Sequence, residues 1–290
     1  MNIQILSDLH LETPKAYDFY ETIPTAPHLA LLGDIGCVCD PGYLTFLTAQ
    51  LKQFKIVFHV LGNHEPYCSS WNSVIAKLRM FEKENRQQRA ADPSLGEYIL
   101  LNQNEYHLPE YNITILGCTL FSHIPKTSLA DVSFGLNDFF RIDSWTVEGH
   151  ISAHARDLAW LNARISALSQ EQPNHKLIIF THHSPTIDPR TINPRTAGNK
   201  ISSGFATDLR NETCWVGENV AFWAFGHTHF NFPSWRDEQG GTFVYSNQRG
   251  YYFSQAAGFT ERGVVKIGRD GGVVVDAGTD APVPSPEPDS

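Results

Sequence analysis

The sequence contains little cysteine, and it has no long apolar run. Its five cysteines are odd in number and lack the paired spacing of a zinc ribbon: Cys37, Cys39, Cys68, Cys118 and Cys214. Cys37 and Cys39 follow Asp34 closely, but one intervening residue and no partner pair favour incidental thiols over metal ligands. The N-terminal segment has no basic leader, and no segment is long enough to span a bilayer. We therefore expect a cytoplasmic protein with reduced thiols and no membrane association.

Basic residues are also scarce relative to acidic ones. The chain has 22 lysines and arginines against 31 aspartates and glutamates, which gives a formal net charge of -9. This balance argues against general binding of nucleic acids or anionic membranes, because both need a basic field to gather phosphates. A single small phosphate ester could still be attracted by bound metal ions.

The composition predicts one domain followed by a tail. With 290 residues, of which 41% are hydrophobic, the chain can bury one large core. We assign residues 1–278 to this domain. Residues 279–290 are rich in proline and acidic, so we expect a disordered tail without secondary structure.

Seven short apolar runs rich in β-branched residues predict strands. They cover residues 3–6, 28–32, 56–60, 113–116, 177–181, 220–225 and 242–246. Helical periodicity covers residues 44–54, 71–91 and 151–168, and these helices should cover the sheets. Residues 121–150 are aromatic without clear periodicity. This segment is either a rim or lid over a substrate or a loop that packs its aromatic residues into a satellite core.

Five of the apolar runs lead directly into short polar signatures. These are Asp8-Leu9-His10, Gly33-Asp34, Gly62-Asn63-His64-Glu65, His182-His183 and Gly226-His227-Thr228-His229. Ligands on loops beyond the carboxyl ends of strands are typical of sites in α/β sheets, so we expect the signatures to converge. They supply carboxylate, amide and imidazole groups but no thiolate. This mixture suits Mn, Fe or Zn in a hydrated catalytic site.

Two transition-metal ions about 3.5 Å apart need a bridging ligand, and a carboxylate with two oxygens suits that position. Asp34 is the candidate bridge. We predict two ion positions, with the ligands Asp8, His10 and His229 for one and Asn63, His182 and His227 for the other. Asn63 ligates without adding negative charge, which leaves its ion more electrophilic. Glycines at positions 33, 62 and 226 should permit tight turns directly after the strands.

The ordered set of signatures resembles the calcineurin-like metallophosphoesterase superfamily, and its motifs span residues 8–229. The resemblance implies an α/β fold in which two mixed β-sheets pack as a sandwich flanked by helices. It also implies in-line hydrolysis of a phosphate ester by a metal-bridging hydroxide, with Asp34 and His64 as catalytic residues. His64 matches the family's non-ligand histidine, which protonates the leaving group, and an imidazole can act as a general acid near neutral pH.

The pair His182 and His183 leaves a choice open. The family supplies one ligand here, and successive side chains on an extended backbone point in opposite directions. We predict that His182 is the ligand and that His183 turns toward the substrate rim. The reverse assignment remains an alternative.

Other candidate substrate contacts lie in loops after the signatures or in the aromatic segment. They are Tyr67, His123, Asn231 and Arg249, in addition to His183. Arg190, Arg195 and Arg210 are further loop arginines that could grip a phosphate. Each of these residues also has an ordinary structural interpretation. Trp71, Asn137 and Trp145 are candidates of the same kind.

The chain lacks the signatures of protein serine/threonine phosphatases. In those enzymes the aspartate belongs to an arginine-bearing GDxxDRG motif, but here Asp34 is followed by Ile35, Gly36 and Cys37. The segment around His182 also lacks their HGG pattern. The layout resembles the small phosphodiesterase branch, which implies small diester substrates such as cyclic nucleotides. The alternatives are a phosphomonoesterase acting on nucleotides or other small monoesters, and a non-catalytic scaffold. Scaffolds of this kind usually lack ligands that this chain retains. The sequence does not indicate the oligomeric state.

Overall fold

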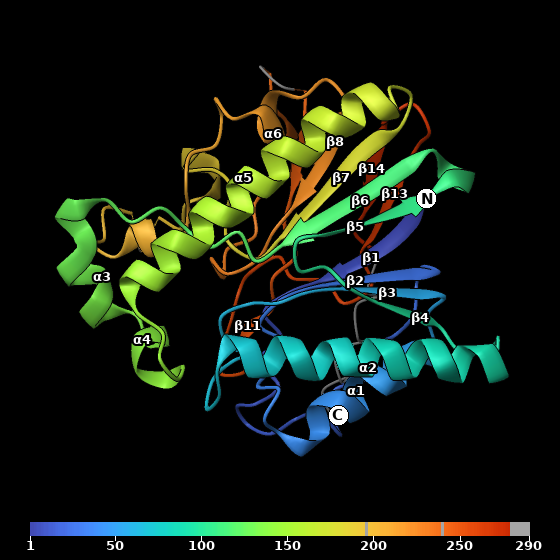
Figure 1. Ribbon diagram of the computed structural model, residues 1–290, viewed down its shortest axis with the longest axis horizontal. Helices are drawn as coiled ribbons and strands as arrows, with labels where there is room; N and C mark the ends of the chain where they lie inside the picture. The colour runs from blue at the N-terminus through green and yellow to red at the C-terminus, as the bar shows by residue number, and fades with distance from the viewer. Residues whose placement is uncertain (195–196, 239–240, 279–290) are drawn as a thin grey trace, which may run out of the picture.

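Two six-stranded sheets pack face to face, with helices on their outer faces (Figure 1). The computed structural model describes residues 1–194, 197–238 and 241–278. The predicted sandwich of two mixed sheets flanked by helices is therefore confirmed. The predicted tail, residues 279–290, lies outside the described residues, and the assignment of residues 1–278 to one domain stays a prediction.

The first sheet has four parallel strands at its centre and edge, and two antiparallel strands complete it. In spatial order its strands are β14 (Val273–Asp276), β13 (Val264–Ile267), β1 (Asn2–Leu6), β2 (His28–Leu32), β3 (Ile56–Val60) and β4 (Glu97–Leu100). Helices α1 (Pro41–Leu51) and α2 (Trp71–Ala91) cover its outer face (Figure 1).

The second sheet has four parallel strands flanked by an antiparallel strand at each edge. In spatial order its strands are β5 (Asn104–Leu108), β6 (Ile113–Cys118), β7 (Lys176–Thr181), β8 (Val220–Ala224), β10 (Phe243–Tyr245) and β9 (Trp235–Arg236). Helices α5 (Val147–Glu171) and α6 (Thr213–Val216) cover its outer face.

Alternation along the strands divides the core into layers. Ile3 and Ile5 of β1 and Phe180 of β7 lie between the two sheets, whereas Leu6 packs with the α1 and α2 layer. Parallel strands covered on both faces are apolar at every position, which explains why their runs were visible in the sequence. None of the helices in the described part of the chain is long and apolar enough to cross a bilayer.

Several boundaries differ from the predictions because of local capping. The predicted helix 44–54 is α1, which begins at Pro41, and proline at the first helical position has a pre-set φ. The predicted helix 151–168 is α5, which begins after Thr146, whose side chain accepts a hydrogen bond from the amide of Gly149. The structure also contains strands that were not predicted: β4, β5, β9, β13 and β14.

The aromatic segment 121–150 contains α3 (Leu129–Gly135) and α4 (Asp138–Arg141). These helices lie at the end toward which the parallel strands run, as does the hairpin of β11 (Gly250–Tyr251) and β12 (Ser254–Gln255) (Figure 1). Single 3-10 turns occupy Pro109–Tyr111, Lys126–Ser128, Pro189–Thr191 and Ser202–Gly204. Val132 and Leu136 build a small separate core with Val147, so this segment packs a satellite core and also borders the site described next.

Candidate metal centre

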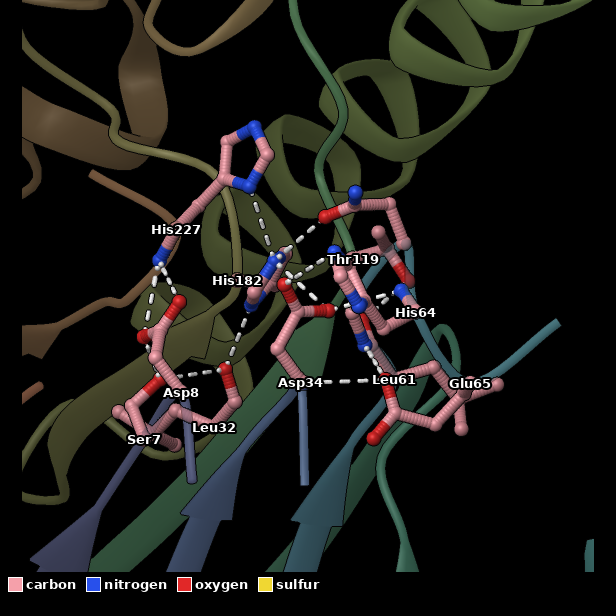
Figure 2. A network of polar contacts seen from close by, with 12 residues as sticks. Ser7, Asp8, Leu32, Asp34, Leu61, His64, Glu65, Thr119, His182 and His227 are labelled. Carbon is pink, nitrogen blue, oxygen red and sulfur yellow. Dashed lines mark hydrogen bonds and ion pairs between the residues drawn. The ribbon is translucent and has the colours of Figure 1, made fainter. Parts of the chain in front are cut away.

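The polar signatures meet at the carboxyl ends of five parallel strands. Asp8 and His10 follow β1, Asp34 follows β2, Asn63 and His64 follow β3, His182 follows β7, and His227 and His229 follow β8. Both sheets therefore supply donors to one place, and Figure 2 shows several of these side chains turned toward Asp34. Backbone bonds tie the loops together, since the amide of His10 donates to the carbonyl of Asp34 over 2.9 Å.

The chain turns sharply at the ligands themselves. Five of the candidate ligands have left-handed backbone conformations with φ between 47° and 70°: Asp8, His10, Asp34, His227 and His229. This conformation costs a residue other than glycine on the order of 1 kcal/mol or more. The surrounding fold therefore stabilises a strained arrangement that turns these side chains inward.

The three glycines next to the ligands serve two different purposes. Gly33 has a φ of 86°, so it provides the expected tight turn. Gly62 and Gly226 do not have a positive φ. A Cβ on Gly62 would collide with the Asp34 carboxylate, and a Cβ on Gly226 would collide with the Ser7 hydroxyl. These two positions require glycine because neighbouring side chains approach the backbone closely, which corrects the turn interpretation.

A first donor group consists of Asp8, His10, Asp34 and His229, with one donor atom of each within 4.8 Å of the others. The Nε2 atoms of His10 and His229 are 2.8 Å apart. His229 Nε2 lies 3.3 Å from Asp8 Oδ1, and His10 Nε2 lies 3.8 Å from Asp34 Oδ2. The group presents two carboxylates and two imidazoles to a common point.

A second donor group consists of Asp34, His182 and His227, joined by the amide oxygen of Asn63. His182 Nε2 lies 3.0 Å from Asn63 Oδ1, 3.2 Å from His227 Nδ1 and 3.4 Å from Asp34 Oδ1. Asp34 belongs to both groups, with Oδ2 toward the first and Oδ1 toward the second. It therefore occupies the place of a bridging ligand.

Hydrogen bonds around the second group show that its lone pairs converge. His182 Nδ1 donates to the carbonyl of Leu32 over 2.8 Å, so the lone pair of a neutral His182 lies on Nε2. Asn63 Nδ2 donates to Asp138 Oδ1 over 2.8 Å, which turns Asn63 Oδ1 toward the same point. Acceptors that face one another in a buried site are satisfied by a cation or by a proton. The pKa of His182 rises to about 9 despite its burial, because the Asp34 carboxylate favours a positive charge at this point. The residues thus fit a bound metal ion.

His183 takes no part in either donor group. It is fully buried, and neither ring nitrogen has a hydrogen-bond partner among the described residues. Its ring packs against His227, His150 and Phe121, with 4.1 Å between the ring centres of His183 and His227. Burial keeps the pKa of His183 well below its usual value. The geometry favours His182 as the ligand.

His64 lies beside the first group and is held on three sides. Its Nδ1 is 2.8 Å from Glu12 Oε1, its ring stacks on Tyr67, and its Nε2 is 3.4 Å from the Tyr251 hydroxyl. Burial opposes a charge on this imidazole, but the carboxylates of Asp34 and Glu12 raise its pKa to about 9. Glu12, His10 and His64 form a further trio of potential donors.

A pocket of about 330 Å³ opens onto both donor groups. Asp34, Asn63, His64, His227 and His229 form its floor. Its walls consist of Tyr67, Gly135, Leu136, Asn137, Asp138, Asn193, Ile201, Phe205, Thr228 and Tyr251. A larger hollow of about 580 Å³ between Tyr17 and Gln53 contains none of the candidate ligands.

Most of the predicted substrate residues lie away from this pocket. Tyr67 and Asn137 line it, whereas His123, Asn231 and Arg249 do not. The Arg249 guanidinium donates to the carbonyl of Leu9, and Asn231 Nδ2 donates to the carbonyl of Gln248. Both side chains thus support loops. Trp145 packs on Trp71, Arg190 and Arg210 pair with Asp188 and Asp208, and Arg195 lies outside the described residues.

Four residues of the site were missed or had no predicted role. Glu65 accepts hydrogen bonds from the amides of Asp34, Ile35 and Gly62 and so joins the loops after β2 and β3. Asp138 holds Asn63 and Tyr67, Glu12 holds His64, and Tyr251 packs on His10. Two of them had a local signal, because Glu65 ends the signature that begins at Gly62 and Glu12 continues the alternate spacing of Asp8 and His10.

An α/β sandwich with nitrogen and oxygen donors gathered at its strand ends is the arrangement of a metal-dependent hydrolase. The family model of the calcineurin-like phosphoesterases matches residues 1–231, and the chain belongs to this family. Members use divalent metal ions to hydrolyse phosphoesters, which agrees with the donor groups described above.

Two relatives illustrate how far the similarity extends. The chain is 26% identical over 267 residues to the uncharacterized protein L509 of Acanthamoeba polyphaga mimivirus, covering 86% of this chain and 91% of the relative. The crystal structure of the phosphopantetheinyl hydrolase of Mycobacterium tuberculosis superposes with a TM-score of 0.63 at 17% identity. That match covers 86% of this chain and 89% of the neighbour, and it shows a shared fold.

Proposed function

We propose that this phosphoesterase is a phosphodiesterase with a two-ion centre, and that it acts on small diesters such as cyclic nucleotides. The charge of the pocket carries the proposal. None of the described residues that line it is a lysine or an arginine, and one wall contributes the buried carboxyl group of Asp138.

This charge balance distinguishes the two ester classes. A phosphomonoester carries close to two negative charges at neutral pH, and proteins usually grip such a group with arginine or lysine. A phosphodiester carries one negative charge and has a second organic substituent that needs space. A pocket whose described lining holds no lysine or arginine, and which has Asp138 in its wall, suits the diester better.

The residues of the site would have two roles, metal binding and proton donation. Asp8, His10, Asp34 and His229 would hold one ion, and Asp34, Asn63, His182 and His227 would hold the other. Bound ions would lower the pKa of coordinated water and withdraw charge from the phosphoryl oxygens. Mn, Fe and Zn all suit such nitrogen and oxygen donors. His64 would donate a proton from Nε2 to the departing oxygen, because Glu12 occupies its other nitrogen.

The apolar part of the pocket lining supports a nucleoside as the organic substituent. Leu136, Ile201 and Phe205 offer apolar surface, and Asn137 offers an amide that can bond the edge of a base. The structural neighbour is a phosphopantetheinyl hydrolase. A phosphopantetheine ester therefore belongs in the substrate panel beside the cyclic nucleotides.

A matched pair of substrates tests the ester class. Bis(p-nitrophenyl) phosphate and p-nitrophenyl phosphate share a leaving group and differ in ester class, so their kcat/KM values with added Mn²⁺ compare the classes directly. We expect at least about a tenfold preference for the diester, which corresponds to about 1.4 kcal/mol. A preference for the monoester would overturn the proposal. Asp34→Asn, purified in the same way, controls for contaminating phosphatases.

Cyclic AMP and cyclic GMP then test the narrower substrate. Both are diesters with a nucleoside substituent, so the proposal expects hydrolysis by the wild type with added Mn²⁺, measured by chromatography of the nucleotide products. Hydrolysis of the aryl diester without hydrolysis of either cyclic nucleotide would overturn the cyclic-nucleotide assignment and leave the diester class intact.

A further inference from the structure

A single oxygen atom of Glu12 contacts both a candidate metal ligand, His10, and the candidate acid, His64. This atom, Oε1, lies 3.2 Å from His10 Nδ1 and 2.8 Å from His64 Nδ1. Both contacts are side-chain contacts, and the Glu12 side chain is only 9% exposed. The other carboxylate oxygen, Oε2, is buried and has no hydrogen-bond partner among the described residues. The carboxylate is therefore directed at these two histidines.

A carboxylate can only accept, so each histidine must place a proton on Nδ1. For His10 this leaves the lone pair on Nε2, the atom that faces Asp34 and His229 in the first donor group. For His64 it leaves Nε2 free to carry the proton that faces the pocket. One acceptor thus determines the tautomers of both residues, although one is a candidate ligand and the other is a candidate acid.

We propose that Glu12 is a positioning residue that aligns His64 for proton donation while it orients His10 as a ligand. The inference rests on the proposed function insofar as His64 is the acid of that reaction. Tyr67 stacks on the face of His64, with 4.2 Å between ring centres, but stacking does not select a tautomer. Glu12 supplies that selection, and it does so from the same loop as Asp8 and His10.

The dependence on the leaving group separates this role from simple metal support. A departing p-nitrophenolate needs no protonation, whereas a departing alkoxide does. We expect Glu12→Ala to lower kcat about 10- to 100-fold with an alkyl leaving group and about twofold or less with p-nitrophenolate. An equal loss with both leaving groups would overturn the proposal. Glu12→Gln keeps a neutral acceptor, so it should recover part of the loss.

A double-mutant cycle tests whether Glu12 acts through His64. In a His64→Ala background, Glu12→Ala should cause no further loss with the alkyl leaving group, because the group that it positions is already absent. Two independent losses that multiply would contradict the proposal. Glu21→Ala, at an exposed glutamate later in the same connection between β1 and β2, is the matched control and should leave every measurement unchanged.

Two measurements do not depend on catalysis. In the zinc-loaded protein, at a pH high enough to make His64 neutral, the ¹⁵N resonances of His64 should report a proton on Nδ1, and Glu12→Ala should shift them toward a tautomer mixture. Unchanged resonances would overturn the proposal. Glu12→Ala should weaken binding of the first ion, because His10 loses its support, but with excess Zn²⁺ the site should still fill, because no ligand is removed. If Glu12→Ala and His64→Ala both empty the site, Glu12 and His64 are ligands and the proposal is wrong.

These readouts distinguish the inference from the function on which it rests. If wild-type protein hydrolyses no phosphodiester, the proposed function fails. The tautomer of His64 and its dependence on Glu12 would still be measurable, and they would decide the positioning role alone.

Discussion

The two donor groups share Asp34 but differ in charge and burial. The first group adds Asp8 to the shared carboxylate, and its His229 side chain is 24% exposed. The second group adds only neutral donors, and its His182 is fully buried. The first position therefore combines more negative charge with access to solvent.

The groups that support the ligating histidines also differ in charge between the two donor groups. Glu12 accepts a hydrogen bond from His10 Nδ1 in the first group, whereas the carbonyl of Leu32 accepts one from His182 Nδ1 in the second. Asp138 does not contact an imidazole but orients the Asn63 amide. A carboxylate behind a ligating imidazole makes it more basic, and a neutral carbonyl does so less.

This contrast assigns different properties to the two positions. A cation in the first position is held by more charge, so it should bind more tightly. A cation in the second position keeps more of its own charge, so it should attract a phosphoryl oxygen more strongly.

Asp34→Asn should have the largest effect because it alters both positions. It removes the one carboxylate that belongs to both donor groups. We expect metal content to fall at both positions and kcat/KM to fall by about 10⁴-fold or more, measured by elemental analysis and by diester hydrolysis. Retention of both ions would show that Asp34 does not bridge them.

His64→Ala should leave both ion positions occupied and lower the rate of hydrolysis. It removes the proposed acid without removing a member of either position, so metal content should stay near that of the wild type. We expect kcat to fall about 10²- to 10⁴-fold with a poor leaving group. Loss of metal on this substitution would mean that His64 is a ligand or supports one.

Asn63→Asp should make the second position resemble the first. An added carboxylate should tighten the second ion and reduce its pull on the substrate, so affinity and turnover should change in opposite directions. We expect about 10-fold tighter binding of the second ion in a metal titration, with a lower kcat. A simultaneous rise in both would contradict the charge argument.

Asp138→Ala should loosen the second position without removing a ligand. It deletes the acceptor that holds Asn63 and Tyr67. We expect about 10- to 100-fold weaker binding of the second ion only, measured by metal titration. Asp138→Asn, which keeps an acceptor oxygen, is the matched control and should lose less. Equal weakening of both ions would place Asp138 outside the second position.

Tyr251→Phe should have the smallest effect. The Tyr251 ring packs on His10 and His229, and phenylalanine preserves these contacts. Only the hydroxyl near His64 Nε2 is lost. We expect a change in kcat of about threefold or less, because a hydrogen bond as long as 3.4 Å contributes little. A loss near that of His64→Ala would make the hydroxyl a catalytic group.

Much of the fold could be predicted because the central strands are apolar on both faces. Strands β2 and β3 match their predicted bounds, since a parallel strand between covered faces is a short, continuous apolar run. Edge strands such as β4 were missed. The backbone amides of β4 donate hydrogen bonds to the buried Glu82 and Asn85 of α2, and no local pattern in the sequence indicates this contact between two segments.

Substrate contacts could not be predicted in the same way. Arg249 and Asn231 have the chemistry of phosphate or base contacts, but their side chains satisfy backbone carbonyls of loops. Asp138 and Tyr251 come from a short helix and a hairpin that have no signature of their own. Their roles follow from where distant segments pack.

By itself, the sequence determined the order and kind of the candidate ligands. Each ligand directly follows an apolar run, and parallel strands bring such positions to one edge. The tertiary structure decided how Asp34 divides its oxygens between two donor groups. It also decided that His182, and not His183, reaches the second donor group. Glu12 and Asp138 support the ligands for the same reason, through hydrogen bonds to His10 and Asn63. These features depend on distances between segments from both sheets, and the order of residues along the chain does not contain those distances.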